Sequence, residues 1–349
     1  MRLGLSMGYV MGANVREYVE LAQEAERLGY SVVWAAEAYG SDAPTLLSYL
    51  AAKTDRIDVG AAVMQIPGRT PTMTAMTAAT LDLLSDGRFR LGLGVSGPQV
   101  SEGWHGVRFA KPLARTREYI DIVNLALNRR TVQYDGEFFS LPLTDGPGKA
   151  LKLTVHPVRD HIPLYLAAVG PKNLELTGEI ADGWLAIFFS PEFAATALRS
   201  VRSGQDRAGR AGSALDVSAT VPVVIGDDPA ACADPIRGYA ALYVGGMGSR
   251  QQNFYNQLAC RMGFEEQARQ IQDLYLDRKH REAMAAVPFD FIDQTSLLGP
   301  QRRIEERLHA FADAGVTTLT VAAFDADVSQ RVHTLRQVSS AWESAGLAD

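Results

Sequence analysis

Residues 163–189, PLYLAAVGPKNLELTGEIADGWLAIFF, hold one complete strand–helix–strand unit. The apolar run PLYLAA predicts a buried strand, which Gly170 and Pro171 end. A helical segment follows, stops at Gly183 and leads into a second apolar run, WLAIFF. Strand, helix and strand in this order are typical of parallel strands joined by a crossover helix.

The same unit recurs around Gly29, Gly87 and Gly315, where a helical segment ends in glycine and a short apolar strand follows. Glycine fits the left-handed conformation that closes a helix, so we expect that conformation there and at Gly183. Strands are predicted at 3–7, 32–35, 58–63, 89–94, 164–168, 184–188, 217–225 and 317–323. Eight parallel strands alternating with helices favour a (β/α)8 TIM barrel, with residues 1–349 as a single domain.

Two segments are longer than such a barrel needs. Residues 131–162 contain TVQYDGEFFSL, which predicts a hairpin with its turn at Asp135-Gly136. Residues 226–298 are predicted to be mostly helical. We expect both insertions to lie at the functional rim of the barrel or to form a dimer surface.

Composition excludes several classes of protein. A formal net charge of −6 argues against nucleic-acid binding, which needs a basic face. The two cysteines form neither a CxxC motif nor a disulfide framework, and we find no signal peptide and no apolar run of transmembrane length. The six histidines show no HExxH spacing, so no metal site is predicted. These features indicate a cytoplasmic, soluble enzyme.

In a barrel of this type the chemistry lies at the carboxyl ends of the strands. Small, apolar and amide side chains predominate there in this sequence, and no GxSxG nucleophile motif occurs. Such a mouth suits an aromatic cofactor that brings its own reactivity. The motif GLGVSG, residues 92–97, matches the dinucleotide pattern, but Pro98, Gly103 and Gly106 oppose the helix that pattern requires. We expect its glycines to let a flat ring lie against the strand.

Residues 169–173 combine a glycine, a proline at the first helical position and a lysine. The free N–H groups at the start of the helix favour an anion, and Lys172 adds positive charge. The segment is therefore a candidate phosphate cradle. An ordinary strand-to-helix turn remains the alternative, because glycine and proline are common in turns.

The chain resembles the bacterial luciferase-like superfamily, in the branch that uses the deazaflavin coenzyme F420. It is similar to actinobacterial F420-dependent oxidoreductases allied to methylenetetrahydromethanopterin reductase. The stretches that carry the resemblance are LGYSVVWAAEAYGSDAPTLLSYLAAKTDRIDVGAAVMQIPGRTP, LDLLSDGRFRLGLGVSGPQVSEGWHG, GPKNLELTGEIADGWL and YVGGMGSRQQNFYNQLACRMGF. Flavin mononucleotide (FMN) is the alternative cofactor.

The resemblance implies a barrel with the deazaflavin across its mouth and a non-proline cis peptide at Ala62-Val63 behind the ring. It also implies cofactor contacts from four strand ends. The cofactor-binding residues that it predicts are Glu37, Ala62, Val63, Met64, Ser96, Ser101, Val169, Gly170, Pro171 and Lys172. Glu37 would stand near the polar edge of the ring, and Val169 to Lys172 would form the phosphate loop.

One departure from the family pattern bears on the reaction. Members that oxidise sugars or alcohols carry a histidine and a glutamate where this chain has Ala38 and Pro98. The base for a hydroxyl proton is then missing, which favours reduction of an activated C=C or C=N acceptor. Glu37 and Glu102 are the candidate catalytic proton donors, unless each carboxylate simply bonds to loop backbone.

The sequence thus predicts an F420-dependent oxidoreductase that acts on a small organic substrate and forms a homodimer or higher homo-oligomer. Two other functions remain open. The first is an FMN-dependent monooxygenase on the same fold. The second is a non-catalytic flavin-binding barrel, which the shortage of obvious acids and bases would fit.

Overall fold

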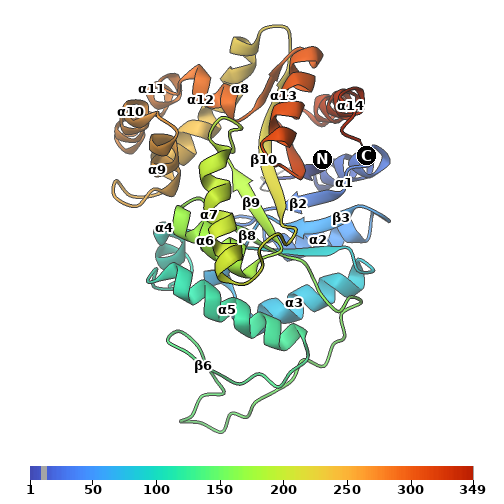
Figure 1. Ribbon diagram of the computed structural model, residues 1–349, viewed down its shortest axis with the longest axis vertical. Helices are drawn as coiled ribbons and strands as arrows, with labels where there is room; N and C mark the ends of the chain where they lie inside the picture. The colour runs from blue at the N-terminus through green and yellow to red at the C-terminus, as the bar shows by residue number, and fades with distance from the viewer. Residues whose placement is uncertain (9–13, 349) are drawn as a thin grey trace.

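The computed structural model describes residues 1–8 and 14–348, and its parallel strands close into a barrel (Figure 1). In β12 and β1, Thr318 stands opposite Arg2, and β10 pairs with both β9 and β12, so the sheet returns on itself. The predicted TIM barrel is confirmed. Its strands are β1 (Arg2–Ser6), β2 (Val32–Ala35), β3 (Asp58–Ala61), β5 (Phe89–Gly94), β8 (Leu164–Ala167), β9 (Gly183–Ile187), β10 (Asp216–Ile225) and β12 (Thr318–Ala323).

Helices cover the outside of the barrel and bury their apolar faces against it. Most begin with proline in the first turn or with a polar cap, as at Asp42, whose carboxylate accepts the N–H of Thr45. No helix within the described ranges is long and apolar enough to cross a bilayer. The barrel helices are α1 (Val15–Arg27), α2 (Ala43–Ala51), α3 (Pro71–Leu84), α4 (Pro98–Gly103), α5 (Pro112–Leu127), α6 (Pro171–Ile180), α7 (Ala194–Arg207), α13 (Gln301–Asp313) and α14 (Val328–Ser344).

The helix-closing glycines behave as expected at three positions and differently at a fourth. Gly29, Gly87 and Gly315 adopt φ of 78°, 75° and 95°, in the left-handed region. The prediction for Gly183 is wrong, because this residue is the first of β9 and has no left-handed φ. A side chain there would collide with the ring of Tyr165 on the neighbouring strand, so glycine is needed for close packing.

The third strand is shorter than predicted and ends in a bulge. β3 stops at Ala61, the peptide between Ala62 and Val63 is cis as predicted, and β4 (Met64–Gln65) then pairs with β5. A Cβ on Gly92 would strike the carbonyl of Ala61, and one on Gly94 would come within 2.6 Å of the Val63 side chain. These two glycines therefore make room for the bulge, whereas the sequence interpretation assigned that space to a flat ring.

The first insertion is the predicted hairpin followed by an irregular return. β6 (Tyr134–Asp135) and β7 (Ser140–Leu141) pair antiparallel, and the segment projects from the body of the molecule (Figure 1). The turn was predicted at Asp135-Gly136, but Asp135 still belongs to β6 and pairs with Ser140, so the connection is residues 136–139. The buried carboxylate of Asp82 on α3 accepts hydrogen bonds from Arg159, which fixes the end of the return.

The second insertion is largely helical, as predicted, and its helices α9 to α12 gather on one side of the barrel (Figure 1). It has its own apolar core around Phe188. The short strand β11 (Leu297–Gly299) pairs with the end of β10. The other elements are α8 (Pro229–Ala241), a π-helix (Leu242–Gly246), α9 (Phe254–Arg261), α10 (Glu265–Leu276), α11 (His280–Ala285) and α12 (Phe289–Gln294).

Candidate functional site

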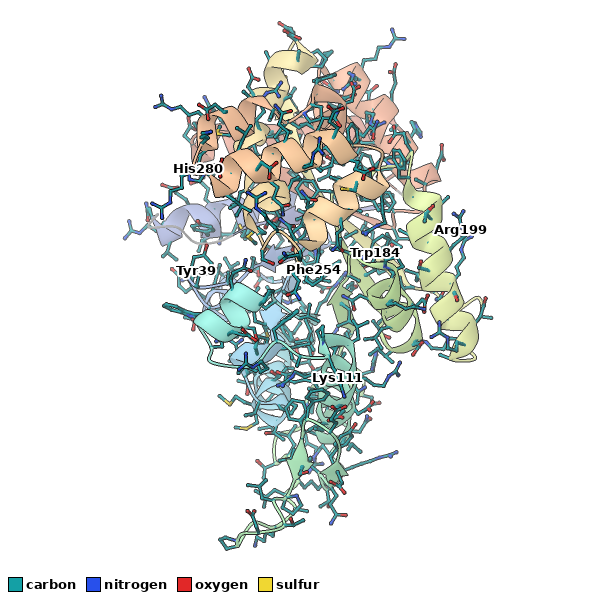
Figure 2. The ribbon with its side chains drawn as sticks, turned by 90° about the vertical axis from the view of Figure 1, so that its left-hand side faces the viewer. Tyr39, Lys111, Trp184, Arg199, Phe254 and His280 are labelled. Carbon is teal, nitrogen blue, oxygen red and sulfur yellow. The ribbon has the colours of Figure 1, made fainter. Side chains whose placement is uncertain are left out.

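The candidate site is the mouth of the barrel, where the predicted cofactor residues follow the carboxyl ends of the strands. The second insertion reaches this mouth from one side. The rings of Phe254 on α9 and Phe109 after α4 lie 6.4 Å apart, and Arg261 on α9 donates to the carbonyl of Val169 at 3.0 Å. Figure 2 shows Phe254 and Tyr39, from the loop after β2, on the same face of the molecule. The insertion therefore contacts the loops that follow β5 and β8.

Glu37, which follows β2, is buried and its carboxylate is fully engaged. Its oxygens accept the backbone N–H groups of Gln65 at 2.9 Å and Ala43 at 3.0 Å, and both also accept from the guanidinium of Arg69. The side chains of Glu37 and Arg69 are only 6% and 17% exposed. Of the two interpretations considered for Glu37, the structure fits the carboxylate that bonds to loop backbone. The carboxylate also forms an ion pair with Arg69.

Gln65 connects this carboxylate to the end of the next strand. Its side-chain N–H donates to the carbonyl of Ala38 at 2.5 Å, and its carbonyl oxygen accepts from the hydroxyl of Ser96 at 2.8 Å. Ser96 has φ of 62°, in the left-handed region that a residue with a side chain seldom occupies. Such conformations cluster at functional sites. Glu37, the bulge and Ser96 are thereby joined in one network.

The three bulge residues differ in how far they face a ligand. Ala62 and Val63 are partly exposed, so the chain presents small apolar groups there. Met64 is completely buried. Its side chain belongs to the core of the protein, and only the backbone of this predicted contact is near the mouth.

Ser101 and Glu102 lie together on α4 but differ in availability. The hydroxyl of Ser101 is buried and donates to the carbonyl of Val107 at 2.7 Å, which makes it a support for the loop after β5. Glu102 keeps a side chain that is 40% exposed. One of its oxygens accepts the N–H of Phe109 at 3.1 Å and faces Arg108 at 3.4 Å, so the second oxygen is the freer one.

The predicted phosphate cradle begins α6. Gly170 is the N-cap, forms no side-chain cap, and would carry a Cβ into space with no described atom within 4 Å. Lys172 is largely exposed and pairs with Glu175, while Arg261 reaches the same turn from α9. Arg261 is exposed, so its guanidinium is accessible beside this turn. The turn thus offers uncapped N–H groups and two cations.

Sequence reasoning missed Arg69, Gln65, Arg261 and His105. The ring of His105 packs against Gly68, 3.2 Å from the position a Cβ would take, and within the described residues its buried Nε2 has no hydrogen-bond partner. Gly68 ends the 3₁₀ turn Ile66–Gly68, directly before Arg69. Only Arg69 carried a visible signal, as the lone charged residue between the third strand and the following helix.

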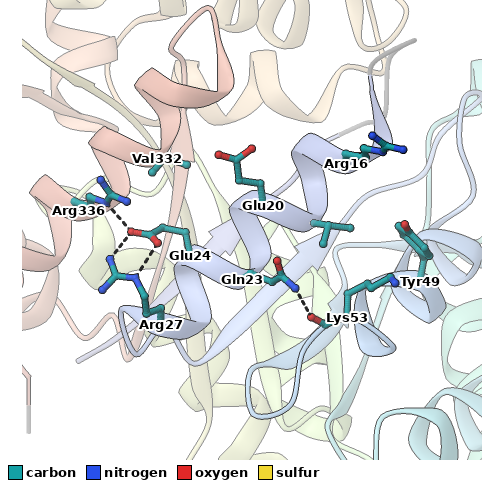
Figure 3. Close-up of a pocket in the computed structure, with 10 residues that line it drawn as sticks. Arg16, Glu20, Gln23, Glu24, Arg27, Tyr49, Lys53, Val332 and Arg336 are labelled. Carbon is teal, nitrogen blue, oxygen red and sulfur yellow. Dashed lines mark hydrogen bonds and ion pairs between the residues drawn. The ribbon is translucent and has the colours of Figure 1, made fainter.

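A separate cavity lies away from the mouth. Its volume is about 560 Å³, and it sits outside the barrel between α1, α2 and α14 (Figure 3). Arg27 and Arg336 on its wall lower the pKa of Glu24 to about 2, so that carboxylate is already paired. The chemistry of a TIM barrel lies at its strand ends, and we therefore assign the site to the mouth. Within residues 1–8 and 14–348 no cluster of His, Cys, Asp or Glu could hold a metal ion.

Comparison with known proteins places the chain among a group of related sequences. The sequence model described as luciferase-like monooxygenase matches residues 3–318. A Mycobacterium tuberculosis protein provisionally named a coenzyme F420-dependent oxidoreductase is 43% identical over 334 residues, covering 94% of this chain and 96% of that protein. The 5,10-methylenetetrahydromethanopterin reductase of Archaeoglobus fulgidus is 27% identical over 312 residues, 88% of each chain.

Solved structures agree on the fold. The coenzyme F420-dependent tetrahydromethanopterin reductase of Methanopyrus kandleri superposes with a TM-score of 0.81 at 23% identity, covering 97% of both chains. An F420-dependent secondary alcohol dehydrogenase, in complex with an F420–acetone adduct, gives a TM-score of 0.78 at 16% identity and covers 97% of this chain and 98% of that one. At these identities the likeness concerns the architecture alone.

Proposed function

Because the chain belongs to the luciferase-like monooxygenase family, we propose that it is an F420-dependent oxidoreductase that transfers a hydride to or from a small organic substrate. The support for the cofactor is the 43% identical relative that bears F420 in its name and aligns along nearly all of this chain. When bound, the deazaflavin supplies the carbon centre, C5, that accepts or gives the hydride.

The observation that carries the proposal is the open turn at Gly170. The uncapped N–H groups at the start of α6 and the cations Lys172 and Arg261 suit the phosphate of the coenzyme. Any side chain at position 170 would occupy the space through which such a phosphate approaches. Arg261, whose side chain crosses from the insertion, adds a second cation to this turn.

We assign the ring to the surface formed by Ala62, Val63 and Ser96. Small apolar groups at the bulge support a flat ring without competing for its polar atoms, and Ser96 offers a hydroxyl at one side. Orientation of the ring against this surface selects the face from which the hydride moves.

For the direction of the reaction we propose reduction of an activated C=C or C=N acceptor. Ala38 and Pro98 supply no base, and every oxygen of Glu37 is already bonded, so it is a poor proton donor. Glu102, with one freer oxygen and partial exposure, is the proton donor that we propose. We propose that Tyr39 and Trp104, which are 64% and 67% exposed, contact the substrate.

Side-by-side titration with F420, FMN and NADPH tests the cofactor. We expect F420 to bind most tightly, whereas tighter binding of FMN would contradict the proposal. Reduced F420 is then offered an enone, an imine or a quinone, and oxidised F420 is offered glucose 6-phosphate or a secondary alcohol. We expect turnover only in the first set, with a loss of about 10²-fold or more in Glu102→Gln. Robust oxidation of the alcohols, or new sugar-phosphate activity in Ala38→His, would contradict the assigned direction.

The assembly that we propose is a homodimer. The outer face of α3 presents Met73, Met76, Leu83 and Leu84, which are 46–57% exposed, and the one charged residue of this helix, Asp82, is buried. A second copy of this face would cover these side chains symmetrically. Light scattering on the purified protein, compared with Met76→Glu, measures the effect; a monomeric wild type would exclude the dimer.

A further inference from the structure

A chain of buried polar contacts runs beneath the mouth and joins three strand ends. Arg69 forms an ion pair with Glu37, Glu37 accepts the backbone N–H of Gln65, and Gln65 accepts the hydroxyl proton of Ser96. The first three residues are mostly or fully buried, with Gln65 only 4% exposed. A change at Arg69 therefore has a continuous route to Ser96.

The network also sets the hydrogen-bond polarity of Ser96. Because the side-chain N–H of Gln65 donates to the carbonyl of Ala38, the amide oxygen of Gln65 points at Ser96. The Ser96 hydroxyl is thereby committed as a donor to Gln65. The lone pairs of its Oγ remain available, so toward the mouth Ser96 presents an acceptor.

We propose that Arg69 is a positioning residue that acts through Glu37 and Gln65 to hold Ser96 as an acceptor for an N–H group of the bound deazaflavin ring. This inference rests on the proposed F420 dependence. An unpaired carboxylate at position 37 would lose its fixed orientation, and with it the hydrogen bond that holds the backbone N–H of Gln65, the residue whose side-chain amide bonds Ser96. Ser96 could then rotate and offer its proton to the mouth instead.

The conformation of Ser96 supports a role beyond the stability of the loop. Its left-handed φ of 62° costs free energy that Gly at the same position would not, and Gly97 follows directly. A serine in this conformation is held by its hydrogen bond to Gln65. The side chain is thus maintained at a local cost, which is expected of a group that contacts a ligand.

A double-mutant cycle on F420 affinity tests the proposal. The variants are Arg69→Lys, Ser96→Ala and the combination, and the readouts are the F420 dissociation constant by fluorescence titration and the urea unfolding midpoint. We expect each single change to raise the dissociation constant about tenfold, as for the loss of one good hydrogen bond. The dissociation constant of the double variant should also rise only about tenfold, because both changes remove the same contact with the coenzyme.

Arg159→Lys is the matched control. Arg159 binds the buried carboxylate of Asp82 on the outer helix α3, so its replacement should lower the unfolding midpoint without changing F420 affinity or coupling to Ser96→Ala. If Arg69→Lys does not fold, Glu37→Gln takes its place in the cycle, since it interrupts the network one contact nearer to Ser96.

The outcomes separate the two proposals. Roughly additive effects, about a hundredfold in the double variant, or unchanged affinity in folded Arg69→Lys, would overturn the positioning role while F420 binding by the wild type stands. A wild-type protein with no measurable affinity for F420 would overturn the proposed function, and the role of Ser96 with it.

Discussion

Each end of the barrel contains an arginine, buried in the case of Arg90 and partly buried in that of Arg69, that pairs with carboxylate side chains, and the two networks are built differently. At the amino ends of the strands Arg90 donates to Asp58 at 2.7 Å and to the hydroxyl of Tyr165 at 3.1 Å. Tyr165 in turn donates to Asp216 at 2.8 Å, and Arg2 pairs with the same carboxylate at 2.9 Å. Every member of this network bonds to another member.

The network at the mouth begins in the same way, with Arg69 on Glu37, but it ends in a side chain with unused acceptor capacity. Ser96 gives its proton to Gln65 and keeps free lone pairs. The comparison teaches that similar buried pairs serve different purposes at the two ends. In our proposal the closed network stabilises the barrel and the open one presents a group to a ligand, in keeping with the different roles of the two faces of this fold.

Removal of Arg90 should have the largest effect, and it tests whether the network at the amino ends of the strands serves stability alone. Arg90→Met leaves the carboxylates of Asp58 and Asp216 short of a buried partner, and we expect the free energy of unfolding to fall by about 3 kcal/mol. F420 affinity of the folded fraction should stay within about twofold of the wild type. Urea unfolding and fluorescence titration measure the two quantities.

The exposed pair of Arg302 and Glu306, 90% and 64% exposed, provides the control for this experiment. Arg302→Met should change stability by no more than about 0.5 kcal/mol. A similarly small effect of Arg90→Met would show that the network at the amino ends of the strands contributes little to stability.

Gly170→Val should have the opposite pattern at the mouth. The backbone at Gly170 has φ of −84° and open space where a side chain would go, so valine should leave the unfolding midpoint nearly unchanged. We expect the F420 dissociation constant to rise at least about tenfold, close to 1.4 kcal/mol, by obstruction of the phosphate. Unchanged F420 affinity in the folded variant would show that residues 169–173 are an ordinary strand-to-helix turn and not a phosphate-binding site.

The smallest expected effect is the pH dependence of the stability contributed by Asp216, in the network at the amino ends of the strands. Burial alone would raise the pKa of Asp216, but Arg2 and the hydroxyls of Thr317, Thr318 and Tyr165 hold it below its usual value. The folded pKa is thus below the unfolded value of about 3.9, so this carboxylate stabilises the fold above that pH, and the contribution is lost as pH falls through the folded pKa. Asp216→Asn should therefore be less stable than the wild type at pH 7, and the gap should narrow on acidification. A gap that stayed constant in urea unfolding down to about pH 2 would contradict the assigned cause.

Much of the fold could be predicted because its strands and helix ends depend on short, local sequence patterns. Apolar runs marked all of the barrel strands, and Gly29, Gly87 and Gly315 marked helix ends whose geometry depends on neighbouring residues only. The roles predicted for Gly183 and Gly92 were wrong because each glycine is required by a residue on another strand. A side chain at position 183 would collide with Tyr165, and one at position 92 with the carbonyl of Ala61. Contacts of this kind have no signature in the local sequence.

The site was predictable to a smaller extent. The cis peptide at Ala62-Val63 followed from the family resemblance, and the open turn at Gly170 followed from glycine, proline and helix chemistry. Arg261 was missed because it reaches Val169 from 92 residues further along the chain. The internal bonds of Ser101 and the complete burial of Met64 likewise depend on packing that a single sequence does not reveal.

The pairing of β1 with β12 has a consequence for synthesis of the chain. β1 emerges first, yet the partner of one of its edges, Thr318–Ala323, follows roughly 300 residues later. At ribosomal speeds of about 5 to 20 residues per second, this edge of β1 has no strand partner for about 15 to 60 seconds. β1 is short and carries two glycine-adjacent leucines, Leu3 and Leu5, which would be attractive to other nascent strands. The ring of strands therefore cannot close until β12 has been synthesised.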